Sequence, residues 1–193
     1  MTMLQSSKED GFTLAELMLT LCIVGILSGI AIASYSQRWA QERLLAATRE
    51  THTWLENQRL IAIKEGQACE ISINTSTAIL DPSKENISLA DGTLKNSCKE
   101  QAPLSIRDTV KNGSGISLST TDPDATGIRF SFRGLSEIIT TSANKTDQQV
   151  LVFKLNHPES IKQRCIKIMS PLGFIRTGWS SSNTSSCRYS NSF

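Results

Sequence analysis

One carboxylate, Glu16, stands at the start of an apolar segment that covers residues 17–33. A charged side chain inside a membrane span costs roughly 2.5–3.5 kcal/mol, so such a residue usually has a partner of opposite charge. The chemistry that this position offers is therefore an ion pair in an apolar environment. A plain signal anchor, with Glu16 at the level of the lipid headgroups, is the alternative interpretation.

Residues 11–17, with the sequence GFTLAEL, and the apolar run behind them resemble the type IV prepilin signal. The resemblance implies that a prepilin peptidase cuts between Gly11 and Phe12 and methylates the new N-terminus at Phe12. It also implies that Glu16, then the fifth residue, pairs with the α-amino group of a neighbouring subunit. A secretory signal peptide cut near residues 31–33 fits less well, because such peptides begin with basic residues.

The resemblance divides the chain into a leader peptide (residues 1–11), a transmembrane and assembly segment (residues 12–35) and a globular domain (residues 36–193). The leader holds one lysine and two acids, whereas Arg38 and Arg43 follow the span, so charge alone does not orient the chain. The resemblance implies a single-pass inner-membrane protein whose domain is periplasmic or extracellular.

The span does not end in a turn. Residues 35–65 contain no proline or glycine, and apolar residues such as Trp39, Ala47, Trp54 and Ile61 recur at helical spacing. Gly66 is a plausible helix stop. We therefore predict one helix from Phe12 to about residue 65, on the order of 75 Å long.

Short β-prone runs follow Gly66, and turn-forming residues separate most of them. About 155 residues beyond residue 36 suffice for one domain with its own core. The predicted fold is α+β and pilin-like, with a long helix packed on antiparallel sheet. The expected strands cover residues 69–74, 78–80, 104–106, 115–119, 128–132, 137–141, 150–156, 164–169 and 174–179.

Four of the five cysteines lie in the globular part, and Cys22 lies in the apolar segment. An even number of cysteines outside the cytoplasm predicts two disulfides, and the sequence permits three pairings. We favour Cys69–Cys98 and Cys165–Cys187, because each closes a local loop. Zinc is the alternative, but the sequence has no Cys-x-x-Cys and only two histidines.

The globular part also resembles the GspH/FimT group of minor pilins and pseudopilins. The resemblance rests on the helix end at residues 57–66, the strand and turn at residues 128–134, and the final stretch Gly173-Phe174-Ile175-Arg176. Some FimT-type proteins bind DNA through a Gly-Arg-x-Arg stretch. Here Arg176 matches the second arginine, and Phe174 replaces the first.

The last 34 residues, 160–193, carry basic residues and no acid, which is the one electrostatic asymmetry of the chain. These cations indicate a solvated face, with a DNA-binding surface, in which Trp179 and Tyr189 stack on bases, as the alternative. The residues are Lys162, Arg164, Lys167, Arg176 and Arg188.

No catalytic motif is present, and we expect neither an enzyme nor a cofactor. A membrane-anchored enzyme is disfavoured for this reason. Asp122 and Asp124 flank a proline and suit a solvated turn better than a calcium site. The sequence therefore predicts a subunit of a type IV pilus or a type II secretion pseudopilus, with other pilin subunits, prepilin peptidase and the inner membrane as partners. The alternative is a pilus-tip protein that binds double-stranded DNA in natural transformation.

Overall fold

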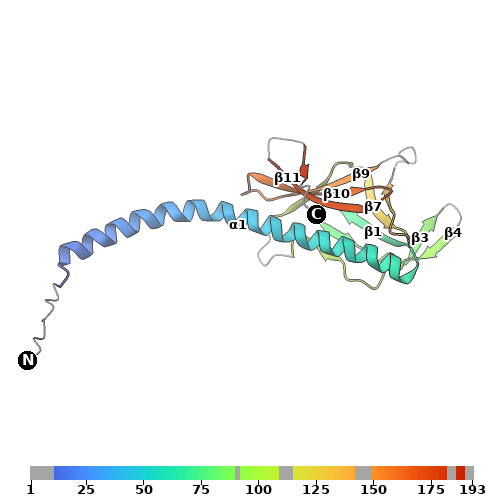
Figure 1. Ribbon diagram of the computed structural model, residues 1–193, viewed down its shortest axis with the longest axis horizontal. Coiled ribbons are helices and arrows are strands. Elements are labelled where there is room, and N and C mark those ends of the chain that lie inside the picture. Colours follow the sequence, from blue (N-terminus) through green and yellow to red (C-terminus); the bar gives the residue numbers. More distant parts are fainter. Residues whose placement is uncertain (1–10, 90–91, 109–114, 142–148, 182–185, 190–193) are drawn as a thin grey trace, which may run out of the picture.

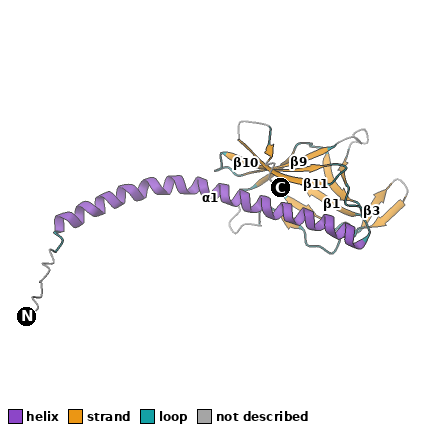
Figure 2. Cartoon of the chain, in the orientation of Figure 1, coloured by secondary structure: helices purple, strands orange, loops and turns teal. Residues whose placement is uncertain are grey.

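The computed structural model describes residues 11–89, 92–108, 115–141, 149–181 and 186–189, without the side chains of residues 30–34, 88–89 and 92. Residues 1–10, which hold most of the expected leader, lie outside the described part. A long helix leaves one end of a globular domain, and its second half lies along the strands (Figure 1). Figure 2 shows this division, with helix on one side and strands on the other.

The helix α1 covers Leu14–Glu65, within two residues of the prediction at its start and in agreement at its end. Thr13 is the N-cap, and Gly66 ends the helix in the left-handed conformation with φ 65°. Glycine adopts this conformation without the steric cost that a Cβ brings. Among the described residues, no helix combines the length and the apolar character that crossing a membrane requires.

The second half of α1 is anchored by one buried stripe. Ala40 is the first helix residue buried against the sheets, and Leu44, Ala47, Leu55 and Ala62 continue the stripe at helical spacing. Alanine at several of these positions lets the helix backbone approach the strands closely. Burial of each large apolar side chain contributes about 1.5–3 kcal/mol, so this face holds the helix on the domain.

In the described part of the chain, the strands form two five-stranded antiparallel sheets and a separate hairpin. The first sheet has the order β5-β2-β1-β7-β8, the second β12-β11-β10-β9-β6, and β3 pairs with β4. The strands are β1 (Cys69–Asn74), β2 (Ile79–Asp81), β3 (Asn86–Leu89), β4 (Gly92–Lys95), β5 (Leu104–Ser105), β6 (Ser117–Thr120), β7 (Ala125–Phe130), β8 (Ser136–Thr140), β9 (Val150–Asn156), β10 (Lys162–Met169), β11 (Phe174–Ser181) and β12 (Arg188–Tyr189).

The predicted fold class, a long helix on antiparallel sheets, is confirmed. The strands expected over residues 69–74 and 150–156 have the same bounds as the observed strands β1 and β9. The expected strand over residues 128–132 was placed too far along the chain. Ser131 N–H donates to Leu135 O at 2.8 Å, and this turn leaves Phe132 half exposed. The β3–β4 hairpin and β12 were not predicted.

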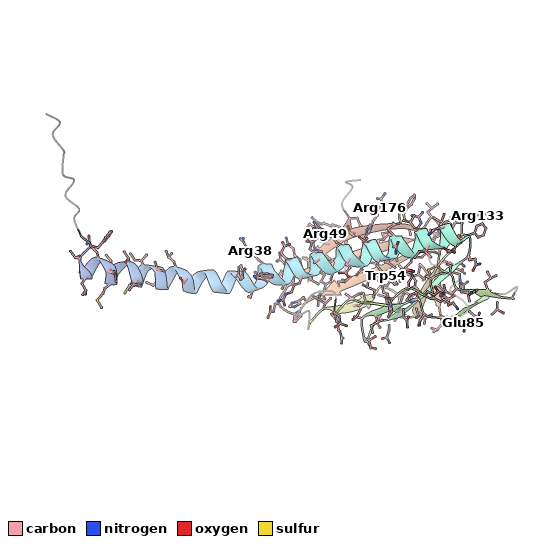
Figure 3. All side chains as sticks on the ribbon, turned by 90° about the horizontal axis from the view of Figure 1, so that it is seen from below. Arg38, Arg49, Trp54, Glu85, Arg133 and Arg176 are labelled. Atoms are coloured by element: carbon pink, nitrogen blue, oxygen red, sulfur yellow. A yellow bond between two sulfur atoms is a disulfide. The ribbon has the colours of Figure 1, made fainter. Side chains whose placement is uncertain are left out.

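Two turns, at residues 131–135 and residues 170–173, meet at the end of the domain where α1 ends. Ser136 N–H donates to Pro171 O at 2.9 Å, and Arg59 Nε donates to Gly134 O at 2.9 Å. Figure 3 shows Arg133 of the first turn at this end, and Arg38 at the opposite end of the domain on the exposed helix. A side chain at Gly173, in the second turn, would collide with the carbonyl oxygen of Gly134.

We therefore expect Gly173→Ala to destabilise the domain more than Gly66→Ala. Both glycines have positive φ, 69° and 65°, so both substitutions incur about 1–2 kcal/mol of backbone strain. A Cβ at Gly66 meets nothing within 4 Å, whereas at Gly173 it adds overpacking of about 1–3 kcal/mol. Urea unfolding of the two variants measures the difference, and equal destabilisation would show that the two turns are not closely packed.

Candidate functional site

The helix begins with a reciprocal cap between Thr13 and Glu16. Glu16 N–H donates to Thr13 Oγ1 at 3.3 Å, while Thr13 N–H and Thr13 Oγ1 each lie 2.9 Å from Glu16 Oε2. This capping box satisfies backbone donors that the first helical turn leaves unpaired. The sequence analysis missed this role of Glu16, although the Thr-x-x-Glu spacing is its usual signal.

One oxygen of Glu16 stays available. Both contacts from Thr13 use Oε2, and Oε1 receives no hydrogen bond from the described residues. The side chain is exposed, as are those around it: Phe12 is 84% exposed, and Leu14 and Leu17 are also exposed. The carboxylate can therefore hold the helix start with one oxygen and accept a cation with the other.

The four cysteines of the globular part form two disulfides, Cys69–Cys98 and Cys165–Cys187. These are the two pairings favoured from the sequence. Cys22 is free and exposed on the first half of α1. The second disulfide joins β10 to the segment before β12, so it fixes the chain after β11 onto the second sheet.

The register of the second sheet divides the five cations of the C-terminal region between its two faces. Side chains alternate along a strand, and directly opposed residues share a face. Lys162 and Arg164 share a face with the buried Ile166, and Arg188 joins them through its pairing with Trp179, the partner of Arg164. Lys167 and its partner Arg176 lie on the other face. The five predicted residues therefore do not form one surface.

Two of the three cations on the Ile166 face lie over one indole ring, that of Trp179. Lys162 Nζ lies 5.4 Å and Arg188 Cζ 5.7 Å from the centroid of Trp179. Burial lowers the pKa of Arg164; Glu42 opposes this shift and Arg49 adds to it. Since Glu42 and Arg49 belong to α1, Arg164 lies between the sheet and the helix. We call Lys162, Arg164, Trp179 and Arg188 the Trp179 cluster.

The opposite face carries a second, smaller group. Lys167 and Arg176 are direct cross-strand partners, and Lys167 Nζ lies 5.3 Å from the Tyr189 ring centroid. Burial raises the pKa of the Tyr189 hydroxyl, so this phenol stays neutral at physiological pH. Like charges directly opposite each other destabilise a sheet, which makes this pair a candidate for an anionic ligand.

The acidic turn between β6 and β7 is built as a turn. Asp122 is buried, and its Oδ1 accepts the N–H of Asp124 at 3.0 Å, a local contact typical of aspartate in turns. Among the described residues, no group of three or more histidine, cysteine, aspartate or glutamate side chains is arranged to hold a metal ion.

A buried polar centre behind the first disulfide was missed from the sequence. Asn96 is 1% exposed, and its amide nitrogen donates to the carbonyls of Glu70, Pro82 and Lys84 at 2.8–3.0 Å. The buried Glu70 carboxylate bonds Lys84 Nζ at 2.6 Å and Arg129 at 2.8 Å. No local sequence pattern signals such a centre, because its members come from separate segments.

Comparison with known proteins agrees with the helix and its start. The model of the prokaryotic N-terminal methylation motif matches residues 6–32, which include Gly11, Phe12 and Glu16. The motif therefore coincides with the start of the long helix that packs on the antiparallel sheets.

Two relatives can be named. The chain is 38% identical over 76 residues to the type IV major fimbrial protein FimA of Dichelobacter nodosus, a match that covers 38% of this chain and 48% of that protein. The chain thus spans about half the length of this relative. Among solved structures, it is similar to the minor pseudopilin EpsH of the type 2 secretion system of Vibrio cholerae. That match has a TM-score of 0.43 and 16% identity, and covers 72% of this chain and 97% of that one.

Proposed function

We propose that this chain is a minor pilin or pseudopilin of the GspH/FimT type, a structural subunit assembled into a type IV pilus or a type II secretion pseudopilus. The observation that carries the proposal is Glu16, an exposed carboxylate that caps an apolar helix with one oxygen unoccupied. The apolar run of the sequence continues from there to residue 33. The helix then enters the globular domain without a break.

In this proposal, residues 1–11 are the leader, and prepilin peptidase cuts after Gly11 and methylates Phe12. Residues 12–35 anchor the precursor in the inner membrane and later pack against the same segments of other subunits. Glu16 Oε1 accepts the amine of a neighbouring Phe12, which neutralises two charges in an apolar bundle and fixes the stagger between subunits. The domain, residues 36–193, lies outside the cytoplasm.

The processing step has a direct test. In a host with a prepilin peptidase, we expect the mature protein to begin at Phe12 and to carry one additional methyl group, as read by intact-mass spectrometry. Gly11→Val, which places a branched side chain next to the cut, should leave the precursor uncut. Gly25→Val is the matched control, because Gly25 has open space around it and lies away from the bond. A mature Phe12 terminus on the Gly11→Val protein would argue against this cut site.

A second candidate function, DNA binding at a pilus tip for uptake, is favoured by the face that carries Lys167 and Arg176. These two cations lie directly opposite each other, and Lys167 lies over the Tyr189 ring, so this face combines side-chain types that contact phosphates and stack on bases. Arg176 is also the position that matches the DNA-binding stretch of FimT-type proteins.

The DNA-binding candidate is tested with the oxidised domain, residues 39–193, and a double-stranded oligonucleotide across a salt series. We expect Arg176→Ala to weaken binding and to reduce the slope of log K against log salt by about 1, as for one lost phosphate contact. Arg188→Ala, on the opposite face, is the control and should leave that slope unchanged. Binding that is absent at low salt, or equal for both variants, would remove this candidate.

A further inference from the structure

The end of the domain from which the apolar helix emerges is rich in aromatic and cationic side chains. Tyr35 and Trp39 are 60% and 48% exposed on α1, and their rings meet edge to face with centroids 5.6 Å apart. On the second sheet, Trp179 is 39% exposed, with Lys162 and Arg188 over its ring. Neither group is explained by packing of the core, because each ring keeps a large exposed area.

Arg164 connects these two groups. It is the cross-strand partner of Trp179, and its electrostatic neighbours on α1 are Glu42 and Arg49. The Trp179 cluster therefore lies beside the first packed turns of the helix. The exposed Ile161 directly precedes Lys162, the first residue of β10. In the sequence, residues 35–49 of α1 carry three arginines, Arg38, Arg43 and Arg49, against the single acid Glu42, and residues 160–193 carry no acid.

The length of the helix determines how far this end of the domain lies from a membrane. The estimate rests on the proposed function, in which residues 12–35 span the bilayer. About 20 residues cross a hydrocarbon core about 30 Å thick, which places the boundary near residue 33 when counting starts at Leu14. Ala40, the first buried helix residue, follows about 10 Å further on. The headgroup layer itself adds about 5–8 Å. The first packed turn of the domain therefore lies within about 5 Å of the headgroup layer, a gap that a long side chain can bridge.

The helix leaves the domain little freedom to avoid this contact. It is continuous from Leu14 to Glu65, with no loop between the apolar half and the packed half. Its gentle curve is visible in Figure 1. Tyrosine and tryptophan prefer the headgroup level of a bilayer, and lysine and arginine there attract anionic lipids. By the same count Tyr35 lies within the headgroup layer, and Trp39 and the Trp179 cluster lie just beyond it, on the end of the domain nearest the membrane.

We propose that the Trp179 cluster, together with Ile161, Tyr35 and Trp39, is a docking surface for anionic phospholipid headgroups that holds the domain against the membrane before assembly. Lys162, Arg164 and Arg188 contact lipid phosphates, and the three aromatic rings lie at the headgroup level. A nucleic acid is a poorer occupant of this face. The apolar helix emerges beside it, whereas the Lys167 and Arg176 face points away from the helix.

The test uses the full chain in nanodiscs of phosphatidylcholine alone or with one third phosphatidylglycerol. A polarity-sensitive fluorophore is attached at position 161 through Ile161→Cys, in a Cys22→Ser background that removes the free thiol. We expect a more apolar label environment in the anionic discs, and loss of this difference near 1 M salt, where the screening length is about 3 Å. Since each cation near such a surface contributes about five-fold, Lys162→Glu with Arg188→Glu should lower the docked-to-undocked ratio about 30-fold or more.

The charge-matched control is Lys167→Glu with Arg176→Glu, which alters β10 and β11 on the opposite face of the same sheet and should leave the label environment unchanged. Equal label signals in neutral and anionic discs, or equal effects of the two double variants, would overturn the proposal. So would a response to a DNA duplex that is larger than the response to anionic lipid. If the chain fails to insert into either disc, the proposed membrane anchor itself is wrong, which is a distinct result.

Discussion

Replacing Glu16 with glutamine is expected to abolish incorporation of this protein into fibres while leaving its domain folded. Glutamine can replace glutamate in a capping box, so the contact with the Thr13 backbone is retained and only the charge is lost. In the proposed assembly, that charge neutralises the amine of a neighbouring Phe12. Loss of about 2.5–3.5 kcal/mol per subunit contact corresponds to roughly 100-fold lower incorporation. Immunoblots of sheared fibres, normalised to the membrane pool, measure the effect.

Two further variants separate the charge of Glu16 from its cap. Glu16→Ala loses both, so it should fail to assemble at least as completely as Glu16→Gln. Glu50→Gln removes an exposed carboxylate elsewhere on α1 and should assemble normally. All three should unfold at the same temperature as the parent, because the buried stripe of α1 begins only at Ala40. Normal incorporation of Glu16→Gln, with loss for Glu16→Ala, would assign Glu16 to helix capping alone.

The parts of the fold that the sequence predicted well are those with a local cause. The helix follows from residues 35–65, which lack breakers and are followed by Gly66. The strand β9 follows from a short run of β-prone residues, of which Leu151, Phe153 and Leu155 are fully buried. The disulfide pairings also follow from proximity along the chain. In each case, neighbours in sequence are sufficient to explain the structure.

The arrangement of the C-terminal cations was less predictable, because it depends on which residues of β10 and β11 lie opposite each other. Lys162 and Arg164 have even positions along β10 and Lys167 has an odd one, so their side chains point to opposite faces of the sheet. The sequence already contains this alternation, but the prediction did not apply it. Arg176 could be placed only once the turn before β11 had fixed which residue of β10 it opposes. Nothing local indicates that Lys84 pairs with the Glu70 carboxylate, or that the Asn96 amide donates to the Glu70 carbonyl, since those contacts join residues 14 and 26 positions apart.

Asn96→Ala is expected to destabilise the domain by about 5 kcal/mol, the largest effect of a single substitution outside the apolar core. Besides its three donated bonds, Asn96 Oδ1 accepts the N–H groups of Glu70 at 3.0 Å and Cys98 at 3.4 Å. Removing the amide leaves four buried backbone groups and the part-buried carbonyl of Lys84 without this partner, and each buried group costs about 1–3 kcal/mol before relaxation. Denaturant unfolding of the oxidised protein, followed by tryptophan fluorescence, measures the loss.

Asn74→Ala is the matched control. Asn74 also accepts from a side chain and a backbone N–H, Ser76 Oγ at 2.7 Å and Thr77 N at 3.1 Å, but it is exposed, so water replaces both bonds. Its substitution should cost no more than about 1 kcal/mol. If Asn96→Ala costs as little as Asn74→Ala, the amide is not the centre that joins β1 to the segment before the disulfide.

Removing the neighbouring disulfide together with the Asn96 amide gives a stricter test of this prediction. Cys69–Cys98 closes a loop of 29 residues, for which the chain-entropy relation gives about 3–4 kcal/mol. Cys69→Ala with Cys98→Ala should therefore be tolerated alone, as should Asn96→Ala, in a domain whose total stability lies in the usual range of about 5–15 kcal/mol. The triple variant loses roughly 8–9 kcal/mol if the terms add, and should be largely unfolded without denaturant. A folded triple variant would show that the first sheet is held mainly by its apolar face, by Ile71, Ile128 and Phe130, rather than by the polar centre behind it.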